Sequence, residues 1–242
     1  DGSVTKLMEE IHQDEALYEQ FIEPEEALSM MTEQSLVIVV DTHKPSLVID
    51  ERIVEKAEKV VVIDHHRRGE EFIDNTLLVY MEPYASSTAE LVTELLEYQP
   101  KTEKLTMLES TALLAGIIVD TKSFTLRTGS RTFEAASFLR TNRADTVLVQ
   151  RLLKEDIETY VERAKLVETV ELLDRGIAIA KGSDKEIYGS VLIAQTADIL
   201  LTMEGVAASF VIAPRADGRI GISARSLGEL NVQVVMEELG GG

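Results

Sequence analysis

The stretch Val60-Val61-Val62-Ile63-Asp64-His65-His66-Arg67-Arg68 decides the fold. Its first four residues are β-branched, and a short run of this kind is typical of a buried strand in a parallel sheet. An acid, two imidazoles and two guanidiniums follow at the point where the strand ends. Open α/β sheets bind ligands beyond the carboxyl ends of their strands. The stretch therefore predicts a polar site at that edge, although a strand ending in solvated polar residues would show the same pattern.

A second apolar run, Leu36 to Val40, is followed by Asp41-Thr42-His43-Lys44-Pro45. Residues 51–58, between the two runs, have a helical pattern, so we expect a βαβ unit. A third strand is expected at 76–81. The stretch Ser86-Ser87-Thr88-Ala89-Glu90 then begins a helix, and its serine and glutamate favour helix capping over catalysis.

The pattern of helices and strands along the chain predicts an α/β protein with two domains. Helices are expected within 3–34 and at 104–119, 131–139, 145–153 and 157–173. Strands are expected at 176–181, 187–194, 207–213 and 219–224. We therefore expect a first domain over 1–150, a linker helix within 151–175 and a smaller domain over 176–242.

Composition limits the chemistry. The 242 residues include no cysteine, so a metal would be held by oxygen and nitrogen atoms. The formal net charge of −19 disfavours binding to a long nucleic acid, and a phosphate ligand would need bound cations or a local basic cluster. No apolar run approaches the ~20 residues that span a bilayer, so we expect no direct membrane contact. The opening Asp1-Gly2-Ser3 and the closing glycines suggest a fragment.

Asp120 is a third candidate ligand, after Asp41 and His65, because it follows the fully apolar turn 116–119 and a lone buried carboxylate is unfavourable. Carboxylate and imidazole ligands without sulfur suit Mn²⁺ or Mg²⁺. Two such ions about 3.5–4 Å apart would clamp the attacking and leaving oxygens of a phosphoryl displacement. Three protein ligands are too few for two ions, so further carboxylates should come from outside this sequence.

Two basic stretches are candidates for phosphate binding. The first places Lys122, Arg127 and Arg131 around a turn, and a solvated loop explains it equally well. The second runs from Arg225-Ser226 through a glycine turn to Asn231. An anion site and an ordinary strand-turn-helix connection, with Asn231 as the helix cap, fit this pattern equally.

These residues together resemble the DHH/DHHA1 phosphoesterase family. The resemblance rests on Asp41-Thr42-His43-Lys44-Pro45, Asp64-His65-His66, Gly116 to Thr121, and Arg225-Ser226 with Asn231-Val232 and the final glycines. It covers nearly the whole chain. It implies a DHH domain with a mainly parallel sheet flanked by helices, a linker helix, and a mixed α/β DHHA1 domain truncated at its glycine-rich motif.

The resemblance also implies residue roles. Asp41, His65 and Asp120 would bind Mn²⁺, with two ions in the complete site. Asp64 would support His65, and His66 would donate a hydrogen bond to the scissile phosphate. Asp64 and His66 are the expected catalytic residues. The remaining expected residues would bind substrate. They are His43, Arg67, Arg225, Ser226, Asn231, Gly240, Gly241 and Gly242.

The implied activity is hydrolysis of cyclic-di-AMP to linear 5′-pApA by metal-activated hydroxide. The alternatives are an oligoribonuclease with pAp phosphatase activity and a sensor that binds a nucleotide without cleaving it. The family's first motif, His-x-Asn-Pro-Asp-x-Asp, is absent from this sequence, as is the histidine after the glycine run, so we expect little activity from this chain alone. The resemblance further implies a homodimer on the cytoplasmic side of a membrane-anchored parent protein.

Overall fold

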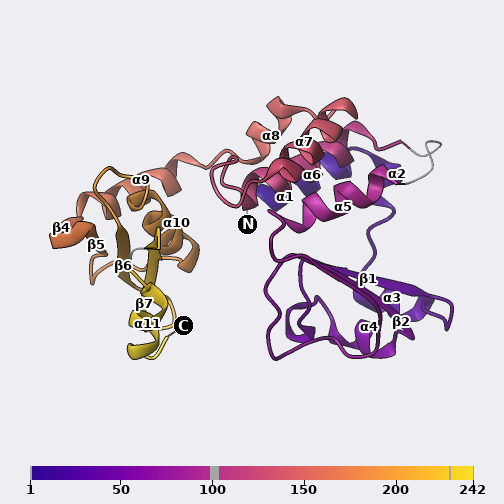
Figure 1. Ribbon diagram of the computed structural model, residues 1–242, viewed down its shortest axis with the longest axis horizontal. Helices are drawn as coiled ribbons and strands as arrows, with labels where there is room; N and C mark the ends of the chain where they lie inside the picture. Colours follow the sequence, from indigo (N-terminus) through magenta and orange to yellow (C-terminus); the bar gives the residue numbers. More distant parts are fainter. Residues whose placement is uncertain (1, 99–103, 229, 242) are drawn as a thin grey trace. The chain divides into compact units, whose positions relative to one another are not determined.

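The computed structural model describes residues 2–98, 104–228 and 230–241 (Figure 1). The chain divides into two compact units, Asp1–Lys154 and Glu155–Gly242. None of the described helices is both long and apolar enough to cross a membrane. Helices and strands occur in both units, which confirms the α/β class.

The sheet of the first unit is parallel, as predicted. Its strands are β1 (Leu36–Val40), β2 (Lys59–Asp64) and β3 (Thr76–Met81), in the order β1-β2-β3. Strand β2 lies in the centre, and its apolar run is largely buried. The Asp-His-His stretch therefore lies at the carboxyl end of the middle strand, with Asp64 as its last residue.

Helices cover the two faces of this sheet. On one face, α4 (Glu51–Lys56) packs through Val54 against a core that includes Val60 and Val62. On the other face, α5 (Thr88–Glu97) packs its fully buried Leu91 against Ile63. Ser87 caps α5 by accepting a hydrogen bond from the backbone N–H of Glu90, which confirms the predicted cap.

A layer of helices completes the first unit (Figure 1). Helix α5 packs against α6 (Met107–Asp120) and α7 (Ser130–Thr141), and α6 also packs against α8 (Thr146–Leu152). Their shared core includes Leu114, Ile117 and Leu139. Three described helices precede β1: α1 (Gly2–His12), α2 (Glu15–Tyr18) and α3 (Pro24–Met30). The short 3₁₀ helix η1 (Pro45–Leu47) follows β1.

The second unit is a mixed sheet covered by helices. Its elements are α9 (Ile157–Glu168), β4 (Glu171–Leu173), η2 (Asp174–Gly176), β5 (Ile177–Lys181), α10 (Ser190–Leu200), β6 (Ala208–Pro214), β7 (Ile220–Ser226) and α11 (Val232–Glu238). The strand order is β4-β5-β6-β7, with β5 and β6 parallel and the other pairs antiparallel. Helices α9 and α10 pack against each other and against this sheet.

Three parts of this unit differ from the sequence prediction. The helix expected at 157–173 ends at Glu168, and Glu171–Leu173 forms strand β4 instead. The strand expected at 187–194 is wrong, because α10 begins there. Its buried residues Leu192, Ile193, Ala197 and Leu200 follow a helical spacing that places them on one face. Helix α9, expected to act as a linker, contributes the buried Leu166 to the core of this unit.

Candidate metal centre

The parallel pairing of β1 and β2 brings Asp41 next to the end of β2. Val40 pairs with Ile63, and the backbone N–H of Asp41 donates to the Ile63 carbonyl at 3.0 Å. Asp41 has a left-handed backbone with φ of 65°, which aspartate tolerates better than most residues. The chain therefore turns directly after the strand and leaves the Asp41 carboxylate beside His65.

Three predicted metal ligands converge at this edge. The Nε2 atom of His65 lies 3.7 Å from Asp41 Oδ1 and 3.8 Å from Asp120 Oδ2. Both separations are too long for hydrogen bonds. An ion about 2.1 Å from each ligand atom would hold adjacent ligands about 3 Å apart and opposite ligands about 4.2 Å apart. The observed separations fall within this interval. His66 also offers an atom to this cluster, since ligand atoms of Asp41, His65 and His66 lie within 4.8 Å of one another.

The Nδ1 atom of His65 indicates the orientation and the tautomer of the ring. The side chain is buried, and Nδ1 lies 3.4 Å from the carbonyl oxygen of Ala85. With its proton on Nδ1, directed at that carbonyl, the ring presents the Nε2 lone pair to the two carboxylates. The Nε2 atom then has a carboxylate oxygen of Asp41 at 3.7 Å and one of Asp120 at 3.8 Å, and imidazole and carboxylate are donor types that fit a divalent cation.

Asp64 has different partners from those expected. It is fully buried; Oδ2 accepts from His43 Nδ1 at 2.6 Å, and Oδ1 accepts from His66 Nδ1 at 2.7 Å. The backbone N–H of His66 also donates to Oδ1, at 3.1 Å. The structure thus differs from the expectation that Asp64 supports His65. Asp64 instead orients His66, whose side chain is 53% exposed and lies next to the cluster.

His43 was expected to contact substrate, but its buried ring already uses both nitrogens. Nδ1 donates to Asp64, and Nε2 accepts from the backbone N–H of Gly69 at 3.1 Å. Because Nε2 accepts, the proton resides on Nδ1 and the ring is neutral. His43 therefore lacks a free nitrogen for a phosphate and acts as a positioning residue for Asp64.

Two of the carboxyl groups at this edge, those of Asp64 and Asp120, have opposite pKa shifts. Burial raises the pKa of Asp64, but hydrogen bonds from His43 and His66 outweigh it and hold the pKa below its ordinary value. Burial raises the pKa of Asp120; nearby His65 opposes this shift, and the Asp41 carboxylate adds to it. A cation bound beside Asp120 would offset the burial that raises this pKa.

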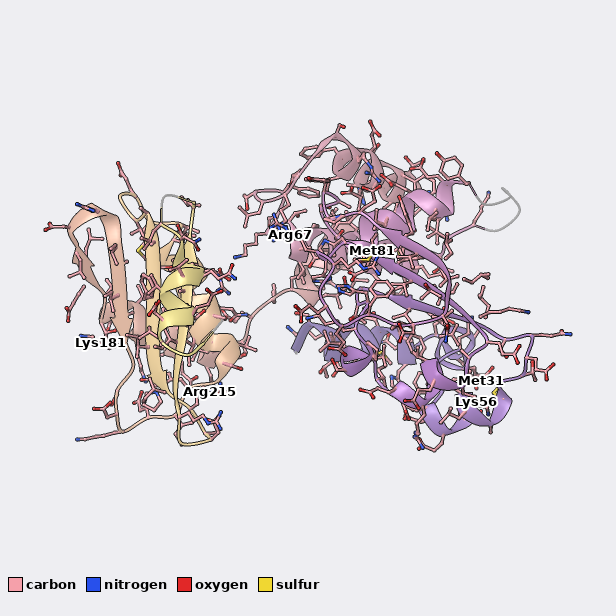
Figure 2. The ribbon with its side chains drawn as sticks, turned by 60° about the horizontal axis from the view of Figure 1, so that its bottom comes forward. Met31, Lys56, Arg67, Met81, Lys181 and Arg215 are labelled. Atoms are coloured by element: carbon pink, nitrogen blue, oxygen red, sulfur yellow. The ribbon has the colours of Figure 1, made fainter. Side chains whose placement is uncertain are left out.

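A groove of about 1000 Å³ begins at His65 and His66. Arg67, from the loop after β2 (labelled in Figure 2), lines it together with Arg127. Arg131, from the same predicted basic cluster as Arg127, instead donates to Glu94 at 2.7 and 2.6 Å. The aromatic residues of this groove were not singled out from the sequence. They are Tyr84, Phe124 and Phe133.

The candidate residues of the second unit have roles in local folding. Arg225 Nε donates to Asp198 at 2.7 Å. Ser226 Oγ accepts from the backbone N–H of Gly228 at 3.1 Å, and Asn231 caps α11. Gly240, with φ of 77°, and Gly241 end that helix, since both backbone N–H groups donate to its last carbonyls. Gly242 lies outside the described residues.

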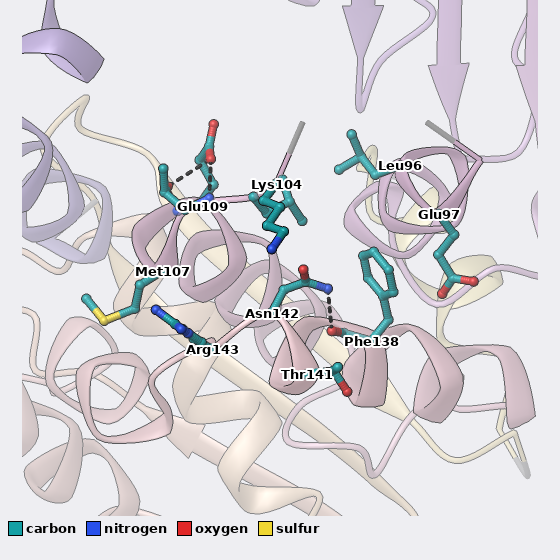
Figure 3. A pocket seen from close by; sticks show the side chains of 11 residues that line it. Leu96, Glu97, Lys104, Met107, Glu109, Phe138, Thr141, Asn142 and Arg143 are labelled. Atoms are coloured by element: carbon teal, nitrogen blue, oxygen red, sulfur yellow. Dashed lines mark hydrogen bonds between the residues drawn. The ribbon is translucent and has the colours of Figure 1, made fainter. Parts of the chain in front are cut away.

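Another cavity, of about 940 Å³, lies between the ends of α5 and α7 and the start of α6 (Figure 3). Its lining mixes charges, with Glu97 and Glu109 beside Lys104 and Arg143. Asn142 uses its side-chain amide to bond the Phe138 carbonyl at 2.9 Å. This cavity contains none of the groups that converge at the strand ends.

Comparison with known families accounts for both units. Residues 2–117 match the model of the DHH family, N-terminal domain, and residues 176–242 match the model of the DHHA1 domain. The chain belongs to the DHH/DHHA1 family. Phosphoesterases with a DHH domain are metal-dependent, in agreement with the donor set at the strand ends.

Curated relatives match along the entire DHH/DHHA1 chain. It is 66% identical over 242 residues to the cyclic-di-AMP phosphodiesterase GdpP of Geobacillus thermodenitrificans, and 62% identical over 243 residues to GdpP of Bacillus subtilis. Each match covers 100% of this chain and 37% of the relative, so the chain spans little more than a third of their length.

A solved structure supports the fold. An exopolyphosphatase-related protein from Bacteroides fragilis aligns with a TM-score of 0.73 and 19% sequence identity. The alignment covers 88% of this chain and 64% of that protein. The likeness concerns the fold alone.

Proposed function

We propose that this chain is the catalytic part of a metal-dependent phosphodiesterase that hydrolyses cyclic-di-AMP to linear 5′-pApA. The observation that carries the proposal is the convergence of Asp41, His65 and Asp120 beside His66. The names and high identity of the GdpP relatives support cyclic-di-AMP as the substrate.

The proposed cofactor is Mn²⁺, with two ions in the complete site. Asp41, His65 and Asp120 would hold the metal through carboxylate oxygens and Nε2. Bound divalent ions lower the pKa of a coordinated water and offset charge on the phosphate. Two ions need more oxygen ligands than these residues supply. The family resemblance assigns them to the His-x-Asn-Pro-Asp-x-Asp segment, so we expect weak Mn²⁺ binding and negligible turnover without it.

The residues around the metal ligands have defined tasks in this proposal. Asp64 holds His66 through Nδ1, so with both nitrogens protonated the ring would direct Nε2–H at a phosphate oxygen. Arg67, which lines the groove, would attract the second phosphate. Water adds to phosphorus and the ribose 3′ oxygen leaves with a proton, which gives one 5′-phosphate and one free 3′-hydroxyl.

The proposed partner is therefore a cyclic dinucleotide rather than a long nucleic acid, in line with the net charge of −19. A homodimer and a membrane-anchored parent protein, with this region on the cytoplasmic side, stay predictions from the resemblance.

The test uses a longer polypeptide that includes the His-x-Asn-Pro-Asp-x-Asp segment, assayed with Mn²⁺ and cyclic-di-AMP. His65→Ala and Asp120→Ala should each lower kcat by about 1000-fold or more, because each removes a metal ligand. His12→Ala is the matched control, since this histidine lies on α1 and is exposed. Unchanged turnover in either ligand variant would contradict the metal assignment.

The same polypeptide separates the alternative activities. Short RNA oligomers added in competition should inhibit poorly if cyclic-di-AMP is the preferred substrate. Preferential cleavage of the oligomers would favour an oligoribonuclease. Tight binding of cyclic-di-AMP with no product after long incubation would favour a sensor.

A further inference from the structure

The groove beside the metal ligands has a composition that is unusual for this chain. Among the described residues that line it there is no aspartate or glutamate, although the sequence contains 43 of them. Arg67 and Arg127 are present instead, and neither forms an ion pair with another described residue. Two arginines in a lining whose described residues include no acidic side chain favour an anionic ligand.

Aromatic rings form one wall of this groove. The rings of Phe124 and Phe133 are stacked, with centroids 5.5 Å apart and planes inclined by 19°. Phe133 is 56% exposed, and Tyr84, also in the lining, is 95% exposed. Exposed rings beside a basic groove are the combination that binds single-stranded nucleotides, because any base can stack on them.

The loop that carries Phe124 and Arg127 is held in an unfavourable conformation. Lys122, Ser123 and Phe124 have φ of 46°, 59° and 64°, and Arg127 has φ of 50°. Residues with a side chain adopt this region at an energetic cost, and strained segments of this kind cluster at ligand sites.

The fully buried Thr121 maintains this loop. Its Oγ1 donates to the carbonyl of Ile117 at 2.7 Å and accepts from the backbone N–H of Phe124 at 3.0 Å. The Thr121 carbonyl accepts from the backbone N–H of Leu126 at 2.9 Å. Because Thr121 directly follows Asp120, the loop that carries Phe124 is hydrogen-bonded to the residue next to a candidate metal ligand.

We propose that this groove is a nucleobase subsite, in which a base of the dinucleotide stacks on the exposed face of Phe133, supported by Phe124. Arg67 and Arg127 contact the phosphate attached to that nucleoside. The inference rests on the proposed function, since it takes the scissile phosphate to lie at His66. It assigns base binding to the first unit, with residues that the family motifs do not mark.

The test compares 5′-AMP with ribose 5-phosphate, which has the same phosphate and no base. Binding of each to this chain is followed by amide NMR, with a separate titration of Mn²⁺. Phe133→Ala should weaken 5′-AMP binding about tenfold, because one stacked base is lost, and leave ribose 5-phosphate binding unchanged. Arg67→Gln should weaken both ligands. Phe133→Tyr, which keeps the ring, should restore 5′-AMP binding.

Phe21→Ala is the matched control, because Phe21 is 52% exposed and lies outside the groove. An unchanged affinity for 5′-AMP in Phe133→Ala, or shifts that avoid residues 121–133, would overturn the subsite. The Mn²⁺ titration tests the proposed function independently of the subsite. Mn²⁺ binding that does not depend on His65 would contradict the metal centre, whatever the nucleotide titrations show.

Discussion

The end of the first unit's parallel sheet and the Arg225–Asn231 stretch of the second unit carry motifs of equal prominence in the sequence, but their polar atoms are used differently. In the first unit, His65 Nε2 lies 3.7 Å from an Asp41 oxygen and 3.8 Å from an Asp120 oxygen, and neither contact is a hydrogen bond. In the second unit, Arg225 bonds Asp198 and Asn231 caps a helix. Donor atoms that converge without satisfying one another indicate a ligand, whereas satisfied ones indicate folding.

The largest expected effect that would test this distinction is on stability. Asp64→Asn replaces a fully buried carboxylate that accepts from His43 and His66. Breaking such a buried network should lower the free energy of unfolding by about 3–5 kcal/mol, measured by urea denaturation. Asp74→Asn, at an exposed position, is the control and should change it little.

The pKa shift of Asp64 adds a pH dependence to that prediction. Hydrogen bonds lower this pKa in the folded state despite burial, so the unfolded chain binds the proton more readily. The stabilisation is therefore present above the ordinary carboxyl pKa of about 4 and is lost as the pH falls further. The difference in stability between wild type and Asp64→Asn should shrink below that pH; a constant difference would contradict the assigned network.

A smaller effect is expected on metal affinity. In the longer polypeptide with the His-x-Asn-Pro-Asp-x-Asp segment, His65→Ala removes the nitrogen that lies within 3.8 Å of both carboxylates and should weaken Mn²⁺ binding by about 100-fold, which is roughly 2.7 kcal/mol. Electron paramagnetic resonance of free Mn²⁺ measures this directly. His12→Ala should bind as wild type does. Equal losses in both variants would indicate a general effect of histidine removal rather than a site at the strand ends.

The smallest effect concerns the second unit. Arg225→Ala breaks the hydrogen bond to Asp198 on a partly exposed side chain, so it should lower the free energy of unfolding by about 1–2 kcal/mol. Mn²⁺ affinity should not change. Arg219→Ala, on an exposed arginine, is the stability control. A free energy of unfolding equal to that of wild type would contradict a stabilising role of Arg225 and favour a role in ligand binding.

The parts of the fold with strong local patterns could be predicted from the sequence. The strands at 36–40 and 76–81 appear as expected, because β-branched and apolar runs of this length suit a parallel sheet. The run at 187–194 was misassigned to a strand, since a short apolar stretch such as Val191-Leu192-Ile193 fits a buried helix equally well.

The site was predictable where topology alone brings residues together. Parallel strands end at one edge, so the proximity of Asp41 and His65 follows from the order of the elements. Pairing over long separations was not predictable. His43 and Asp64 lie 21 positions apart, and the bond between them depends on how the loop after β1 packs against the end of β2. The stacking of Phe124 on Phe133 depends likewise on the left-handed backbone conformation of Phe124 and Arg127.

The most direct test of the metal centre is anomalous diffraction from crystals of this chain soaked in Mn²⁺. The account predicts a manganese peak about 2.2 Å from His65 Nε2 and from carboxylate oxygens of Asp41 and Asp120. A peak bound elsewhere, or an empty strand edge at saturating Mn²⁺, would contradict it.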